Sequence, residues 1–404
     1  MSLEKSLEKV LSRIDERGLV DLTCQMVRIP SVNPPGDYSG MAPFMKQELE
    51  KLALKTVIME KQPGKPNVIG LWEGAHGANH TDRTLLFSGH MDVVTAGDES
   101  AWRFPPFSAT IADGAIWGRG ALDMKGALAA FLYAVKAVKE VYDALPVNVL
   151  LGFTVDDEVP SPMGNKYVIE EGLSKAGWPV PSLHVLGESN DLNITGAFKG
   201  RAWIRVSVKG KSAHGGAPQD GVNAVEKMME LARRVIAIDR ETSPLLGRDT
   251  INIGTFNGGS KVNIVPDECE ATFDYRACFM SGAQIEEKIL SVIERIQRED
   301  PEFILKEFDV FEKRDPVGVA KDSAEVLVLE RAIKAALGKS AGFMGSLSAG
   351  DAYYSIRDGI PGVWVGPGDV SLYHSVNERI NIDDLIDASK VYAAIILEYA
   401  FANI

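Results

Sequence analysis

Histidine and acidic residues follow several apolar segments of this 404-residue chain, at the point where each segment ends. The segments 84–88, 147–155, 183–187 and 362–366 lead to His90 and Asp92, to Asp157 and Glu158, to Glu188, and to His374. Asp123 begins a long helical pattern. Imidazoles and carboxylates without a thiolate suit a divalent ion such as zinc, cobalt or manganese. A carboxylate that bridges two ions about 3.5–4 Å apart gives a site that can bind water and polarise a carbonyl, which predicts hydrolysis.

The apolar segments must be strands of one sheet if these side chains are to meet. They alternate with the helical patterns 41–54, 125–142 and 384–401, which predicts an α/β catalytic domain with a mainly parallel central sheet. Ligand sites in such sheets lie beyond the carboxyl ends of the strands. We therefore expect the histidines and acids to converge on one edge of the sheet.

The pattern changes between 196 and 310. Elements follow in the order β-α-β-β-α-β, which is typical of a ferredoxin-like α+β domain. They are the strand 201–209, the helix 223–238, the strands 250–256 and 268–275, the helix 283–297 and a strand near 303–308. The sequence thus predicts a discontinuous catalytic metal-binding domain, 1–195 and 311–404, and an inserted lid or dimerisation domain, 196–310. The two chain crossings imply a hinge.

The chain resembles the co-catalytic zinc peptidase and amidohydrolase family of acetylornithine deacetylase, succinyl-diaminopimelate desuccinylase, aminoacylase and glutamate carboxypeptidase. The resemblance covers nearly the whole chain and rests on the segments 88–94, 118–126, 157–158 and 187–188 together with His374. It implies a zinc-peptidase-like fold, two divalent metal ions (zinc, with cobalt or manganese as alternatives) and a homodimer formed through the inserted domain.

The resemblance also implies roles for individual residues. His90, Asp123 and Glu188 would hold one ion, and Asp123, Glu158 and His374 the other, so that Asp123 bridges the two. Asp157 occupies the position of the general base, and a cis peptide bond is expected after Asp123. Asp92 is expected to accept the second ring N–H of His90 and so fix its tautomer.

Further residues of the inserted domain are implicated by the same resemblance. His214 would reach across a dimer interface and stabilise the tetrahedral oxyanion; without the resemblance it is a surface loop histidine. Lys199, Asn263 and Arg276 occupy substrate-contacting positions, although Arg276 also suits a surface ion pair and the other two suit local turn structure. We expect no ligand role for the remaining histidines, which are His76, His80 and His184.

The chain departs from the family pattern in two places. The family has two consecutive glutamates where this chain has Asp157 and Glu158, so the carboxylate of Asp157 is one methylene closer to the backbone, and catalysis is sensitive to displacements of about 1 Å. Asp156 is a poor substitute because adjacent strand residues point to opposite faces. Gly350 and Tyr353 stand where the family has a threonine and an arginine, which predicts altered substrate recognition.

Composition excludes several other classes of function. The net charge of −13 disfavours nonspecific binding to nucleic acid or an anionic membrane. Three cysteines without a Cys-x-x-Cys pair argue against a disulfide framework and a thiolate zinc site. The segment 1–10 is charged and amphipathic, unlike a secretory signal, and no apolar run is long enough to cross a bilayer, so a cytoplasmic location is expected.

The sequence therefore predicts a metal-dependent hydrolase that uses metal-activated water to cleave the amide bond of a small N-acyl amino acid or related carboxylate-bearing substrate. One alternative is a dipeptidase or carboxypeptidase on the same scaffold. Another is a low-activity binding or regulatory protein, owing to Asp157. A dinucleotide-binding enzyme is disfavoured, because the segment 118–120 continues to Asp123 where that fingerprint needs a third glycine.

Overall fold

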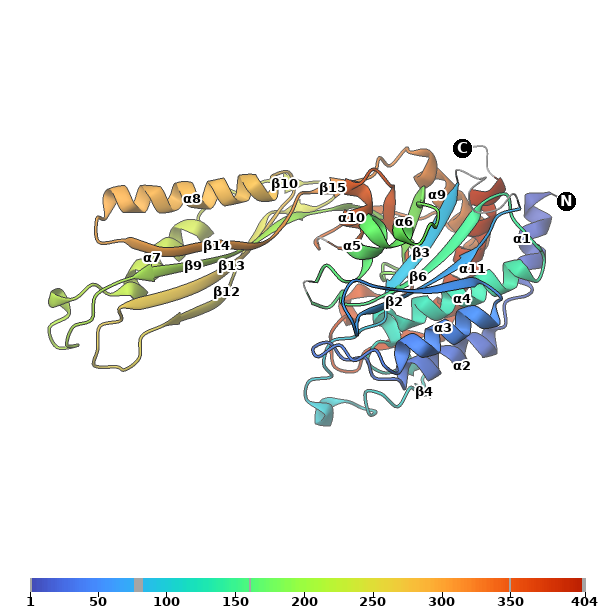
Figure 1. Ribbon diagram of the computed structural model, residues 1–404, viewed down its shortest axis with the longest axis horizontal. Helices are drawn as coiled ribbons and strands as arrows, with labels where there is room; N and C mark the ends of the chain where they lie inside the picture. The colour runs from blue at the N-terminus through green and yellow to red at the C-terminus, as the bar shows by residue number, and fades with distance from the viewer. Residues whose placement is uncertain (1, 76–82, 160, 349, 402–404) are drawn as a thin grey trace. The chain divides into compact units, whose positions relative to one another are not determined.

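The computed structural model describes residues 2–75, 83–159, 161–348 and 350–401 (Figure 1). The chain forms two compact units. Unit 1 comprises Met1–Gly196, Val319–Met344 and Asp351–Ile404, and unit 2 comprises Ala197–Gly318 and Gly345–Gly350. The predicted inserted domain stopped at 310, whereas unit 2 continues to Gly318 because its last long strand, β14 (Ile304–Arg314), runs past the predicted end.

The central sheet of unit 1 has a parallel middle and antiparallel flanks. Strand β3 (Thr84–His90) pairs in parallel with β6 (Asn148–Thr154) and β7 (Leu183–Leu186), and β7 pairs in parallel with β17 (Gly362–Trp364). The antiparallel neighbours are β1 (Lys55–Glu60), β2 (Pro66–Trp72) and β8 (Ile194–Phe198). The predicted strands and their mainly parallel order are confirmed, and the carboxyl ends of β3, β6, β7 and β17 share one edge.

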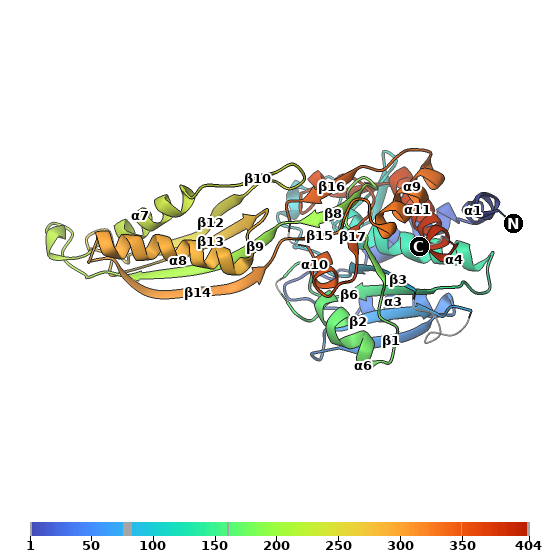
Figure 2. The same ribbon diagram turned by 90° about the horizontal axis from the view of Figure 1, so that it is seen from above.

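Both faces of this sheet are covered, as Figure 2 shows. On β3, Leu85 and Phe87 face the larger core and Leu86 faces the smaller one, since successive side chains of a strand alternate. The larger core also contains residues of most helices of unit 1, namely α1 (Leu3–Leu11), α2 (Glu16–Val27), α3 (Met41–Lys51), α4 (Gly126–Lys139), α9 (Ala324–Leu337) and α11 (Ile382–Phe401). A strand buried on both faces has to be apolar almost throughout, which explains why these strands were clear in the sequence.

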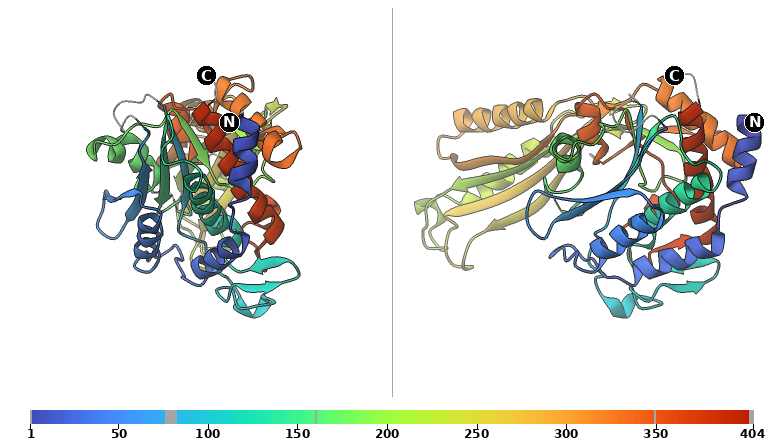
Figure 3. Two further views of the ribbon diagram at one scale, coloured as in Figure 1. Left: turned by 90° about the vertical axis from the view of Figure 1, so that its right-hand side faces the viewer. Right: turned by 45° about the vertical axis from the view of Figure 1, so that its right-hand side comes forward.

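Helices α4 and α11 pack side by side against this face (Figure 3). Phe131 of α4 lies 5.0 Å from Phe87 and 4.4 Å from Tyr392 of α11, measured between ring centroids. Short elements complete unit 1, namely α5 (Asn165–Tyr167), α6 (Leu173–Lys175), α10 (Ala352–Arg357), and a small sheet of β4 (Thr110–Ala112), β5 (Ala115–Trp117) and β18 (Arg379–Asn381). The short strand β15 (Val317–Gly318) belongs to unit 2, and β16 (Phe343–Ser346) begins in unit 1 and ends in unit 2. Helix α4 starts at the segment that carries Asp123, so its packing fixes that segment.

Unit 2 has the predicted β-α-β-β-α-β order. Its antiparallel sheet runs β12-β13-β9-β14 and packs with two helices around its own core. The elements besides β14 are β9 (Gly200–Lys209), α7 (Ala224–Ile236), β12 (Thr250–Gly258), β13 (Glu268–Ala277), α8 (Gly282–Glu299) and the hairpin β10 (Thr242–Ser243) and β11 (Gly247–Arg248). Asn223 and Ser281 cap the two helices, which explains where the helices begin. Among the described helices of both units, none has the length and apolar character of a membrane span.

The buried imidazole of His184 makes the fold sensitive to acid. Its ring nitrogens lie 2.6 Å from Ser88 Oγ of β3 and 2.6 Å from Ser355 Oγ of α10. Burial lowers the pKa of His184 from 6.5 to about 3. Between these values the unfolded chain binds a proton that the folded protein does not, so stability rises with pH and is lost as pH falls from about 6.5 towards 3.

We expect His184→Gln, which cannot titrate, to flatten the pH dependence of the free energy of unfolding between about pH 4 and 6.5. The measurement is denaturant unfolding at several pH values. His214→Gln, which makes the same substitution at an exposed histidine, is the control. An unchanged slope for His184→Gln would contradict this account.

Candidate metal centre

The segment before helix α4 presents the carboxylate of Asp123. Its backbone is not helical at Asp123, with φ −117° and ψ 92°, although the helix begins three residues later. The peptide bond between Asp123 and Met124 is cis, as expected. Gly120 takes a φ of +83°, a conformation that suits glycine, and lets the chain turn into this segment.

Asp123 lies between two imidazoles. Its Oδ1 is 3.0 Å from Nε2 of His90, and its Oδ2 is 3.2 Å from Nε2 of His374. The same nitrogen of His374 is 3.1 Å from Oε2 of Glu158, and Nε2 of His90 is 3.8 Å from Oε1 of Glu188. The five side chains predicted from separate segments therefore meet at the carboxyl edge of the sheet, with Asp123 in the middle.

The donor atoms of this cluster fit divalent cations. The donor atoms of His90, Asp123 and Glu158 lie within 4.8 Å of one another, as do those of His90, Asp157 and Glu188. Oε1 of Glu158 is buried and has no hydrogen-bond partner. A buried carboxylate oxygen without a donor is costly unless a cation faces it. The imidazole and carboxylate donors thus suit a divalent cation; the two groups share His90, and neither coincides with a ligand set that the resemblance implies.

The pKa values describe the same crowding of charge. Burial, followed by the charge of Asp123, raises the pKa of Glu188 to about 7 against the opposing effect of His90. Hydrogen bonds to Asp123 and Glu158 raise the pKa of His374 to about 10. Burial acts to lower the pKa of His90, but the hydrogen bond and charge of Asp123 outweigh it and raise that pKa well above the ordinary value. Cation binding must displace these imidazole protons, so binding should release protons.

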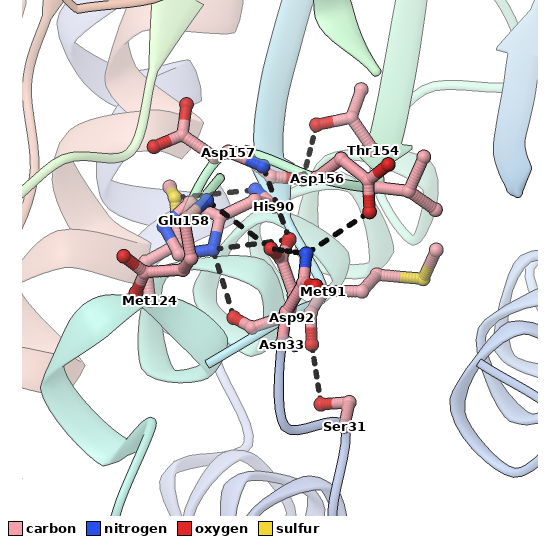
Figure 4. A network of polar contacts seen from close by, with 12 residues as sticks. Ser31, Asn33, His90, Met91, Asp92, Met124, Thr154, Asp156, Asp157 and Glu158 are labelled. Carbon is pink, nitrogen blue, oxygen red and sulfur yellow. Dashed lines mark hydrogen bonds and ion pairs between the residues drawn. The ribbon is translucent and has the colours of Figure 1, made fainter. Parts of the chain in front are cut away.

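The carboxylate of Asp92 has a different partner from the one predicted. Nδ1 of His90 lies 2.9 Å from the backbone oxygen of Asp92 and 3.8 Å from its carboxylate (Figure 4). The carboxylate instead accepts hydrogen bonds from Asn33 Nδ2 at 2.9 Å and from the backbone N–H groups of Asp157 at 3.4 Å and Glu158 at 3.2 Å. These donors occupy the oxygens of the Asp92 carboxylate. His90 therefore contacts the backbone oxygen of Asp92 and not the carboxylate that had been predicted. The backbone oxygen orients the imidazole, and the carboxylate holds the loop of Asp157.

Asp157 reaches the cluster although its side chain is short. One of its carboxylate oxygens is within 4.8 Å of donor atoms of His90 and Glu188. Burial, then the charge of Asp351, raises the pKa of Asp157 well above its ordinary value, with His90 opposing. A carboxylate in this environment can hold a proton, which a general base must do.

Asp156 serves a structural network that the sequence did not reveal. It is buried with a φ of +58°. Its Oδ1 accepts hydrogen bonds from Asn33 at 3.0 Å, Tyr38 at 2.8 Å and Lys65 at 2.7 Å. The network fixes the backbone immediately before Asp157. In the sequence, the only sign of this network is that Asp156 is a charged residue next to the expected base, Asp157.

Glu378 and Tyr373 are two further residues that sequence reasoning missed. Oε1 of Glu378 accepts the backbone N–H groups of Leu122 at 3.0 Å and Asp123 at 3.1 Å, and its Oε2 accepts Arg119 at 2.5 Å. Arg119 also donates to the backbone oxygen of His374 at 3.4 Å. Tyr373 donates its hydroxyl to Glu188 at 2.8 Å. Their nearness to His374 in the sequence was the only hint.

The other predicted site residues belong to unit 2. His214 is exposed, and its Nδ1 accepts the backbone N–H of Gly216 at 3.0 Å. Lys199 is buried and donates to the backbone oxygen of Arg248. Arg276 forms an ion pair with Asp274 at 3.0 Å, which is the alternative to a substrate contact. Asn263 is exposed, and its backbone oxygen accepts a hydrogen bond from the backbone N–H of Gly215 at 2.9 Å.

Of the histidines not expected to be ligands, His184 lies inside the fold, bonded to two serines. His76 and His80 lie outside the described residues.

Comparison with known proteins supports a shared fold and chemistry. Residues 86–398 match the model of the family described as peptidase family M20/M25/M40. The chain is 26% identical over 426 residues to N-formyl-4-amino-5-aminomethyl-2-methylpyrimidine deformylase of Halalkalibacterium halodurans, with 97% of each protein covered. It is also 26% identical over 388 residues to succinyl-diaminopimelate desuccinylase of Delftia acidovorans, covering 92% of this chain and 96% of the relative.

Solved structures share the same architecture. An M20 family metallo-carboxypeptidase from Sulfolobus solfataricus aligns with a TM-score of 0.78 at 21% identity, covering 95% of this chain and 99% of the other. The dipeptidase Dug1p of Saccharomyces cerevisiae aligns with a TM-score of 0.79 at 16% identity over the whole of both chains. At these identities the likeness establishes the fold.

We expect Glu378→Gln to weaken metal binding by about 10–100-fold, because it disturbs the buried acceptor that holds the backbone of Asp123. Leaving Arg119 without its buried partner should also cost about 3–5 kcal/mol of stability. The measurements are calorimetric titration of the apo-protein with zinc and denaturant unfolding. Glu99→Gln, at an exposed glutamate of the same unit, is the control. Wild-type zinc affinity in a folded Glu378→Gln protein would refute the assigned role.

Proposed function

Because the chain belongs to peptidase family M20/M25/M40 and is therefore a metal-dependent hydrolase of amides, we propose that it removes the acyl group from a small N-acyl amino acid or a related carboxylate-bearing amide. The observation that carries the proposal is the carboxylate of Asp123 between the imidazoles of His90 and His374. Two relatives are named as a deformylase and a desuccinylase, which favours deacylation over peptide cleavage.

We assign His90, Asp123 and Glu188 to one ion and Asp123, Glu158 and His374 to the other, with zinc as the first choice and cobalt or manganese as alternatives. Ions held by these groups make water a better nucleophile at neutral pH and polarise the substrate carbonyl. The chain itself must orient the substrate, move the proton and stabilise the developing negative charge.

Asp157 is the proposed proton carrier. It takes a proton from the water that attacks the carbonyl carbon, and it gives that proton to the nitrogen as the carbon–nitrogen bond breaks. Its raised pKa and its position beside His90 and Glu188 support this role. The hydrogen bonds from the backbone N–H groups of Asp157 and Glu158 to Asp92 hold the loop in place.

His214 is the proposed donor to the oxyanion. Since Nδ1 accepts the N–H of Gly216, the neutral ring carries its hydrogen on Nε2, which can then donate. We assign this donation to a second copy of the chain, so that a homodimer completes each site. The exposure of His214 supports an intermolecular role.

Contacts with the substrate carboxylate are assigned to Arg276, Asn263 and Lys199. The guanidinium of Arg276 suits a carboxylate by shape, and it would have to exchange its contact with Asp274 for the substrate. Lys199 would likewise have to exchange its bond to the backbone oxygen of Arg248 for the substrate. Gly350 and Tyr353 stand where the family has a threonine and an arginine. We therefore expect the substrate to differ from those of the better-known family members.

The substrate class can be tested with the purified protein. We expect about two bound zinc ions per chain and metal-dependent turnover of N-formyl, N-acetyl or N-succinyl compounds in a panel that also holds dipeptides. Asp157→Asn is the matched control, expected to keep its metal and lose about 10²–10⁴-fold in kcat. Turnover confined to dipeptides would support a peptidase instead. If no compound is turned over and Asp157→Glu gains activity, the low-activity alternative is supported.

We expect His214→Ala to lower kcat by about 10²–10³-fold without loss of bound metal. A mixed dimer tests whether the histidine acts between subunits. When Asp157→Asn and His214→Ala chains carry different affinity tags, the purified mixed dimer should recover about half of wild-type activity, because one of its two sites has both groups. No recovery in a stable mixed dimer would show that His214 does not act across the interface.

A further inference from the structure

The hydroxyl of Tyr373 has a fixed direction. It accepts a hydrogen bond from the backbone N–H of Ser189 at 2.6 Å, and it lies 2.8 Å from Oε2 of Glu188. The backbone nitrogen can only donate, and a phenol has a single hydrogen. The hydrogen of Tyr373 must therefore point at Glu188, and the bond is charge-assisted when Glu188 is ionised, as it is when it binds a cation.

This bond makes the two oxygens of Glu188 different. Oε2 is occupied by Tyr373, whereas Oε1 lies toward the cluster, 3.8 Å from Nε2 of His90. We propose that Tyr373 is a positioning residue that makes Glu188 bind its metal ion through Oε1 alone. The proposal rests on the proposed function, because it takes Glu188 as a metal ligand.

Tyr373 also joins the two halves of the centre. Its ring stacks on that of His374, with centroids 6.1 Å apart and planes at 18°. His374 is assigned to one ion and Glu188 to the other, so one side chain contacts a ligand of each. A carboxylate that binds through one oxygen leaves a coordination position free, and a catalytic site needs such an open position for water or substrate.

Tyr373→Phe isolates the hydroxyl, because the ring remains and only the oxygen is lost. In this variant both oxygens of Glu188 become available to the ion. We expect a higher coordination number, seen as a change in the visible absorption of the cobalt-substituted protein. We also expect the affinity of one of the two cobalt sites to change by about 10–100-fold while the other is unchanged, in a calorimetric titration of the apo-protein.

Tyr399→Phe is the matched control. Tyr399 is also largely buried, and its hydroxyl also makes one short side-chain hydrogen bond, 2.6 Å to Ser182, away from the proposed ligands. Its loss should affect stability to a similar extent and leave the cobalt absorption unchanged. If both variants change the absorption alike, Tyr373 has a general structural role and the inference is wrong.

Further measurements separate this inference from the function on which it rests. Wild-type protein should bind two cobalt ions, and Glu188→Ala should lose one of them. If both results hold and the absorption of Tyr373→Phe equals that of the wild type, the inference fails and the proposed function stands. If the wild-type protein binds no cobalt, both fail. A changed absorption in Tyr373→Phe alone supports the inference.

Discussion

The crowding of carboxylates, most of them buried, at one edge of the sheet is the constraint on which the rest of the structure depends. Asp123, Asp157, Glu158 and Glu188 share a space in which a few ångströms separate their oxygens from two imidazoles. Carboxylates withdrawn from water repel one another, and without a cation some of them must take up protons. The raised pKa values of Glu188 and Asp157 express this conflict. Divalent ions resolve it, so the need for metal is built into the arrangement of charges.

The fold meets this constraint by fixing each charged segment through its backbone. The Asp92 carboxylate accepts the N–H groups of the loop of Asp157, and the Glu378 carboxylate accepts the N–H of Asp123. Each such acceptor brings more negative charge, which would worsen the crowding if it were alone. Arg119 pairs with Glu378 and offsets its charge, whereas Asn33 donates a hydrogen bond to Asp92. These outer groups hold the segments that carry Asp123 and Asp157, and the pairing of Glu378 with Arg119 adds little net charge to the cluster.

Sequence reasoning predicted what depends on pattern and order. The strands around β3 are apolar because both faces are buried, and side chains that follow such strands meet at one edge, so the histidines and acids of the cluster could be named in advance. The resemblance selected five of them as metal ligands. The resemblance added the bridging role of Asp123 and the cis bond after it. What the sequence could not reveal depends on which atom of a residue faces which neighbour. Asp92 was expected at the site, yet its backbone rather than its carboxylate contacts His90. Glu378 and Tyr373 act through contacts that only the folded chain creates.

The cationic side chains of unit 1 that lie beside the centre have structural partners of their own. Three cationic side chains near the centre are already engaged within this unit. Arg119 is bound to Glu378 and to the backbone of His374, Lys65 to Asp156, and the buried Lys125 to the backbone oxygens of Met26 and Ile29. Using any of them for substrate would release a segment that holds a proposed ligand. The arginine and the histidine proposed to contact the substrate both belong to unit 2. Metal binding and substrate recognition can thus vary separately, which suits a scaffold whose named relatives act on different acyl groups.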